Sequence, residues 1–143
     1  MLSSKYTLRV NAGSGTSTCL EDPSPEIIDH YIDQLRPGLS HFIILESNKK
    51  INHSSFMQMV IRLDDKPDIE YQVELQKFNG DVVSFYRIYE HDIDNVQRYF
   101  RMYALGVLPD LSQWKDVTSE IWEKVAQQQK KSASKASKEV EQV

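Results

Sequence analysis

Residues 69–89 read IEYQVELQKFNGDVVSFYRIY, and they carry the strongest fold signal in the chain. Apolar and polar residues alternate from Ile69 to Gln76, which is the pattern of a strand with one face in water. Asn79 and Gly80 follow, and a second strand-like run begins at Asp81. Asn-Gly between two such runs predicts a tight β-hairpin, because a type I′ turn needs positive φ at both central residues.

A two-residue turn at Asn79 and Gly80 would set the register of this hairpin. It places Phe78 opposite Asp81, and it puts Arg87 diagonal to both Glu70 and Glu74. The side chains between these strands then divide into an apolar core face and a mixed face of acids, amides, aromatics and one arginine. The mixed face is predicted to pair Gln76 with Val83, Glu74 with Phe85, Gln72 with Arg87, and Glu70 with Tyr89.

Three interpretations of the mixed face remain open. It is a solvated sheet face with cross-strand pairs, or a binding surface, because aromatic residues and arginine on a rigid sheet are typical of interface hot spots, or a face that the segment around Trp114 partly covers. On the second interpretation, replacing Phe85 or Arg87 by alanine weakens partner binding without unfolding the domain. The candidate protein-binding residues are Glu70, Gln72, Glu74, Phe85, Arg87 and Tyr89.

The rest of the chain predicts further strands and helices around this hairpin. Alternation indicates strands over residues 5–12 and 56–63, and an apolar run indicates a central strand over 41–46. Helices are predicted from Pro25, from Asp92 to about Gly106, and from Thr118, whereas residues 13–24 are predicted to be a loop. The expected fold is α+β, an antiparallel meander of about five strands with two to three helices packed on one face.

The composition is that of one ordinary globular domain. The 143 residues include 17 basic and 21 acidic side chains, which give a net charge of −4 and no indication of nucleic-acid binding. A single domain over residues 1–126 and a flexible Lys/Ser-rich tail over 127–143 are expected. The chain has a single cysteine, Cys19, and neither a signal sequence nor a membrane span is evident, so a cytoplasmic location is expected.

Local motifs do not predict catalysis, a cofactor or a metal. Residues 13–16 read GSGT but lack the lysine of a phosphate-binding loop, and no spacing among the histidines indicates metal ligands. Glu70 and Glu74 lie about 13 Å apart along a strand, too far for a pair of glycosidase carboxylates. A catalytic site would have to form by convergence in three dimensions, and the residues available for it are His53, His91, Glu70, Glu74 and Cys19.

Scattered aromatic, glycine and proline positions carry a resemblance to a known family. They are Phe42-Ile43-Ile44-Leu45-Glu46, Phe56-Met57-Gln58, Tyr86-Arg87, Phe100, Tyr103, Gly106, Pro109-Asp110 and Trp114. The pattern covers about half of the chain and resembles a family of small, mostly uncharacterised cytosolic α+β proteins of Gram-positive bacteria. The resemblance implies an immunity-type protein, a partner that neutralises a secreted toxin, and it implies no catalytic residue.

The sequence therefore favours a non-enzymatic protein-binding module. An acidic immunity protein would meet a basic toxin domain by charge complementarity. Two alternatives remain: an enzyme whose site forms only in three dimensions, and a homo-oligomeric accessory protein, such as a homodimer, that buries a sheet edge against its twin.

Overall fold

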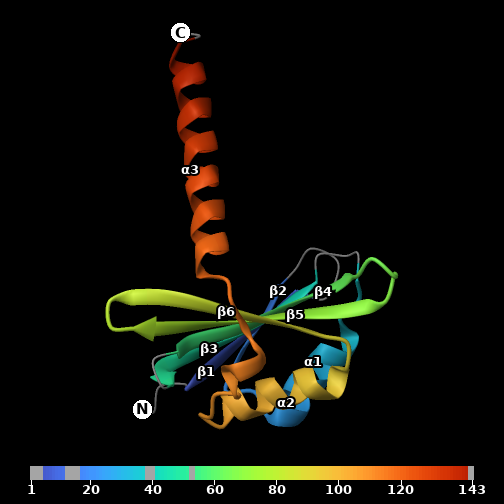
Figure 1. Ribbon diagram of the computed structural model, residues 1–143. Coiled ribbons are helices and arrows are strands. Elements are labelled where there is room, and N and C mark those ends of the chain that lie inside the picture. Colours follow the sequence, from blue (N-terminus) through green and yellow to red (C-terminus); the bar gives the residue numbers. More distant parts are fainter. Residues whose placement is uncertain (1–4, 12–16, 38–40, 52–53, 142–143) are drawn as a thin grey trace.

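The computed structural model describes residues 5–11, 17–37, 41–51 and 54–141, and it has an α+β fold. Figure 1 shows one antiparallel sheet with helices on both sides of it. Within the described residues the elements are, in chain order, β1 (Tyr6–Asn11), β2 (Ser17–Glu21), α1 (Pro25–Gln34), β3 (Phe42–Ile51), β4 (Ser54–Leu63), β5 (Ile69–Asn79), β6 (Val82–Glu90), α2 (Ile93–Ala104), the 3₁₀ turn η1 (Leu111–Gln113), β7 (Lys115–Asp116) and α3 (Thr118–Glu141).

The sheet of the described residues has seven strands in the order β2-β1-β3-β4-β5-β6-β7. The meander from β3 to β6 confirms the expected antiparallel arrangement, but the count of about five strands was too low. The loop prediction for residues 13–24 was wrong over Ser17–Glu21, which pairs with β1 as an edge strand. Its side chains are mostly exposed, so the strand lacks the apolar alternation that would have marked it.

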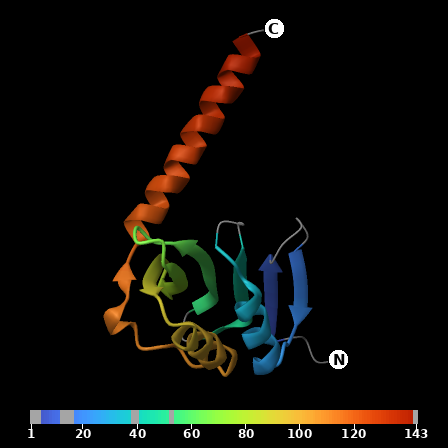
Figure 2. The ribbon, with the colours of Figure 1, turned by 90° about the vertical axis from the view of Figure 1, so that its right-hand side faces the viewer.

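Helices α1 and α2 lie side by side beneath the sheet and cover its apolar face (Figures 1 and 2). Ser24 caps α1 by accepting a hydrogen bond from the backbone N–H of Ile27, and Asp92 caps α2 in the same way through Asp94. The buried core between the helices and the sheet includes Leu8, Val10, Ile28, Ile32, Ile43, Leu45, Met57, Met59, Val73, Leu75, Val96, Phe100 and Tyr103.

Helix α3 leaves the sheet on the side opposite α1 and α2, as Figures 1 and 2 both show. The sequence predicts a last helix from Thr118, and the structure confirms it. The backbone stays helical to Glu141, through most of the segment predicted to be a flexible tail. Residues 110–143 contain neither glycine nor proline, so nothing in the covalent chain ends the helix earlier. The flexibility of this segment stays a prediction.

The β5–β6 turn lies one residue later than predicted. Asn79 pairs with Val82 as the last residue of β5, and the two turn residues are Gly80 and Asp81. Gly80 has a φ of +66° whereas Asp81 is not among the positive-φ residues, which is the type II′ arrangement rather than type I′. One glycine at the first turn position is sufficient for this turn, so Asn79 remains in the strand.

This correction shifts each cross-strand partner by two positions. Phe85 lies opposite Gln76, Arg87 opposite Glu74, and Tyr89 opposite Gln72. Because side chains in a strand alternate with a period of two, every residue keeps its predicted face although its partner changes. Arg87 is therefore directly opposite Glu74, not diagonal to it.

Candidate binding surface

The structure brings the predicted site residues together on the outer sheet face, the face opposite α1 and α2. Tyr71, Val73 and Leu75 of β5 point into the core, so the alternate residues of that strand point outward. The register of β4, β5 and β6 puts Glu70, Gln72, Glu74, Phe85, Arg87 and Tyr89 on this outer sheet face. Their exposure differs widely, and it divides the face into a closed part and an open part.

The closed part centres on an ion pair between Glu74 and Arg87. Arg87 donates from Nε (3.3 Å) and Nη2 (3.0 Å) to one carboxylate oxygen of Glu74, and the two residues are each only 8% exposed. Gln58 and Gln72 donate to the other oxygen, both at 3.3 Å. The carboxylate of Glu74 thus accepts four hydrogen bonds, which is the full capacity of its lone pairs.

Helix α3 completes this network from above. Arg87 Nη1 donates to Glu120 in the first turn of α3 at 2.9 Å. Burial alone would lower the pKa of Arg87, but the hydrogen bonds and charge of Glu74 outweigh burial and raise it. The arginine is therefore a cation held between two carboxylates, and it is not a free group on the surface.

An aromatic cluster lies beside this network where α3 meets β6. The ring of Phe85 is 6.5 Å from that of Phe56 and 6.5 Å from that of Trp122. Thr118 Oγ1 accepts a hydrogen bond from the backbone N–H of Phe85, and the N–H of Val117 donates to the Phe85 carbonyl. The start of α3 is thus attached to β6, and Phe85 is half-buried beneath Trp122.

The open part of the face, here called the open corner, consists of Val60, Arg62, Gln72 and Tyr89. Val60 pairs with Gln72, which in turn pairs with Tyr89, so these side chains are neighbours across three strands. Tyr89 is 44% exposed and Val60 37% exposed. The guanidinium groups of Arg62 and Arg87 lie 5.7 Å and 5.9 Å from the Tyr89 ring centroid, within the range of cation–π contacts.

Carboxylates border the open corner and form an acidic rim: Asp64, Asp65, Asp68 and Glu70. Asp64 Oδ1 accepts the backbone N–H groups of Lys66 and Asp68, and Oδ2 lies 2.9 Å from His91 Nε2. The backbone hydrogen bond from Asp68, followed by the contact with His91, lowers the pKa of Asp64. Glu70 is 9% exposed and pairs with Arg62 at 2.9 Å.

Of the residues considered for a catalytic site, only His91 and Glu70 approach each other in the described part of the chain. Cys19 is exposed on the edge strand β2, opposite Arg9 of β1. His91 approaches Glu70 at 3.7 Å, whereas Glu74 is occupied by its four donors. His53 and residues 13–16 lie outside the described residues.

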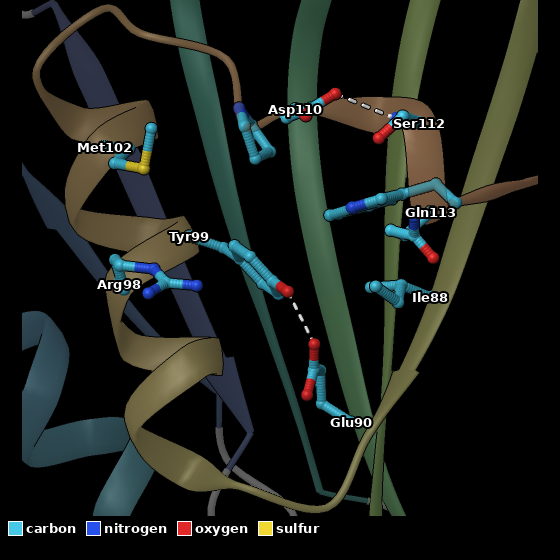
Figure 3. Close-up of a pocket in the computed structure, with 10 residues that line it drawn as sticks. Ile88, Glu90, Arg98, Tyr99, Met102, Asp110, Ser112 and Gln113 are labelled. Atoms are coloured by element: carbon cyan, nitrogen blue, oxygen red, sulfur yellow. Dashed lines mark hydrogen bonds between the residues drawn. The ribbon is translucent and has the colours of Figure 1, made fainter.

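A separate depression of about 550 Å³ opens on the other side of the sheet, between α2 and the segment that follows it (Figure 3). Trp114 packs edge-on against Tyr99, with ring centroids 5.4 Å apart, so the segment folds back onto the body. Tyr99 donates a hydrogen bond of 2.5 Å to Glu90 of β6. Burial, together with this contact, raises the pKa of Tyr99 to about 12, so the phenol is neutral at physiological pH.

Sequence reasoning missed the meeting of Asp64, Glu70 and His91. These residues lie at the ends of three adjacent strands, and their ligand atoms are all within 4.8 Å of one another. Their positions relative to the strands could have predicted this meeting. Asp64 and His91 directly follow β4 and β6, and Glu70 lies near the start of β5. In an antiparallel meander those three positions share one end of the sheet.

Comparisons of the chain with protein-family models, with curated proteins and with solved structures find no match. The resemblance to a bacterial immunity-type family is not tested by these comparisons and stays a prediction. Among the described residues, none of the helices combines the length and apolarity needed to cross a bilayer.

Proposed function

We propose that this protein is a non-enzymatic protein-binding module that captures a basic partner protein at the open corner and its acidic rim. The observation that carries the proposal is Tyr89, an aromatic side chain left 44% exposed in a strand within the sheet. Exposed aromatic residues on a rigid framework lose little conformational entropy on binding, and for this reason they recur at interface hot spots.

The surroundings of Tyr89 support this role. The two flanking arginines are each paired with a carboxylate, Arg62 with Glu70 and Arg87 with Glu74, so the ring is supported by an ordered charged frame. Exposed Val60 adds apolar area next to Gln72. An apolar and aromatic centre with a polar border is the usual anatomy of a protein interface.

The negative charge of the acidic rim favours a basic partner. The rim has four carboxylates and one lysine, Lys66, and two further acids lie nearby in the chain: Asp92 caps α2 and Asp94 lies in its first turn. Such a field attracts positively charged proteins and raises their association rate at low ionic strength. The immunity-type function implied by the family resemblance is the specific form of this proposal, with a basic toxin domain as the partner.

The test compares three variants in capture experiments from an extract of the native host. Tyr89→Ala and Val60→Glu change the open corner, whereas Val107→Glu changes a valine of similar exposure in the segment after α2. We expect the first two variants to capture at least tenfold less of the same basic protein, and Val107→Glu to capture as much as wild type. Capture should also fall between 0.1 and 0.5 M salt because exposed charges are then screened.

Thermal unfolding of each variant separates a binding defect from a folding defect. If Tyr89→Ala and Val60→Glu keep the wild-type melting temperature and the same captured proteins, the open corner is not the interface. Partners that are all acidic would contradict the role given to the rim.

A further inference from the structure

Asp64, Glu70 and His91 come from three segments that meet at one end of the sheet. Asp64 opens the β4–β5 turn, Glu70 lies in β5, and His91 follows β6. His91 Nε2 lies 2.9 Å from Asp64 Oδ2 and 3.7 Å from Glu70 Oε2. We propose that these three side chains form a binding site for a divalent transition-metal cation of the Zn²⁺ type.

The spacing of the ligand atoms fits such an ion. Zinc binds nitrogen and carboxylate oxygen at about 2.0–2.2 Å, so two ligands of a tetrahedral ion lie about 3.4 Å apart. The two distances from His91 bracket that value. The ligand atoms of all three residues lie within 4.8 Å of one another, so side-chain rotation would have to bring the widest pair closer around one ion.

The carboxylate of Asp64 is already oriented for this role. Its Oδ1 accepts the backbone N–H groups of Lys66 and Asp68, both at 2.9 Å. These bonds fix the carboxylate and direct Oδ2 at His91. Metal-binding carboxylates are commonly held through their second oxygen in this way, and such outer contacts tune the affinity of a site.

Glu70 is the buried residue of the three. Only 9% of the residue is exposed, and its Oε1 is a buried oxygen that receives no hydrogen bond from the described residues. Arg62 Nε lies 2.9 Å from this oxygen and forms an ion pair with it, but its N–H is not aligned for a hydrogen bond. Oε2 is the oxygen that lies 3.7 Å from His91, so it is the one offered to a cation, whereas Oε1 stays beside Arg62.

Charge and ligand type indicate the class of ion. The site and its surroundings hold four carboxylates, two of them in the cluster itself, against two bases, Arg62 and Lys66, so the local charge is negative. An imidazole ligand favours zinc, copper, iron or nickel over magnesium and calcium, which prefer oxygen alone. Three protein ligands leave a fourth position that faces the depression of about 410 Å³ lined by the β4–β5 turn and His91.

Zinc binding would join the β4–β5 turn to the link between β6 and α2. The proposal is separate from the proposed function, since the ion can be titrated with no partner protein present. Isothermal titration of full-length protein with ZnCl₂ at pH 7.5 measures it directly. A Cys19→Ser background removes the exposed thiol, which is itself a zinc ligand.

We expect one zinc ion per chain, and we expect His91→Ala and Glu70→Gln each to weaken binding at least tenfold. The matched control is His30→Ala, which removes an exposed histidine from α1 and should change the affinity less than twofold. Co²⁺ bound at the wild-type site should show visible d–d absorption that His91→Ala abolishes. Wild-type protein that binds no Zn²⁺ at 0.1 mM, or equal effects of the His91 and His30 variants, would overturn the proposal.

Discussion

The buried ion pair of Glu74 and Arg87 makes a strong prediction for the variant Arg87→Ala. The sequence predicted that this change weakens binding without unfolding, on the assumption that Arg87 is a surface residue. The structure instead leaves Arg87 8% exposed, with three of its hydrogen bonds made to carboxylates. Removing Arg87 leaves the carboxylate of Glu74, a residue only 8% exposed, without its cationic partner.

The size of the stability loss depends on which hydrogen bonds the Glu74 carboxylate keeps. Breaking a buried ion pair by removing one partner costs about 3–5 kcal/mol, because an uncompensated charge remains. Gln58 and Gln72 still donate to the other oxygen of Glu74, so we expect the lower end of this range, about 3 kcal/mol. That is a large part of the stability of a domain this size.

Urea denaturation followed by circular dichroism measures this loss, and a second variant isolates its cause. In the double variant Glu74→Gln with Arg87→Ala the stranded charge is gone, so it should be more stable than Arg87→Ala alone. Glu120→Ala is the control, because Glu120 is well exposed and its loss leaves the Glu74–Arg87 pair intact. A single variant within 1 kcal/mol of wild type, or a double variant no more stable than the single one, would show that Glu74 is not stranded when Arg87 is lost.

Two further predictions concern the helical side of the sheet. Burial raises the pKa of Tyr103 to about 12, so its proton is held more tightly in the folded state. Stability should therefore fall as pH rises from 10 to 12, by about 3 kcal/mol for this residue, and Tyr103→Phe should show a shallower fall in pH-dependent urea melts. Gly106 ends α2 with a φ of +81°, and an added Cβ would approach only Tyr6 Oη, at 3.8 Å. Gly106→Ala should thus cost about 1–2 kcal/mol for the left-handed backbone alone, and Gly106→Asn less; equal stability of wild type and Gly106→Ala would contradict this.

Much of the fold could be predicted because local chemistry decides it. Alternation marked β4, β5 and β6, and the caps Ser24 and Asp92 marked where α1 and α2 begin. Edge strands were harder: β2 is exposed and β7 has only two residues, so neither carries a periodic apolar pattern. The turn residues were misplaced by one because Asn79 and Gly80 fit a hairpin turn as well as Gly80 and Asp81 do.

The candidate site was predictable only in part. Period-two alternation assigned Glu74, Phe85, Arg87 and Tyr89 to one face, and the two-residue shift in register left that face unchanged. Exposure could not be predicted, because it depends on where the first turn of α3 lies. Thr118 and Val117 attach that turn to Phe85, so it closes one part of the face and leaves Tyr89 open.

Local residue chemistry specified most of the elements and the two faces of the sheet, because turn chemistry, capping and side-chain periodicity act over a few residues. Which polar groups are buried and which meet depends instead on how distant segments pack together. Asp64 and His91 are 27 residues apart in the chain and 2.9 Å apart in the fold. No local pattern encodes that contact, because it depends on the lengths and pairing of β4, β5 and β6 together.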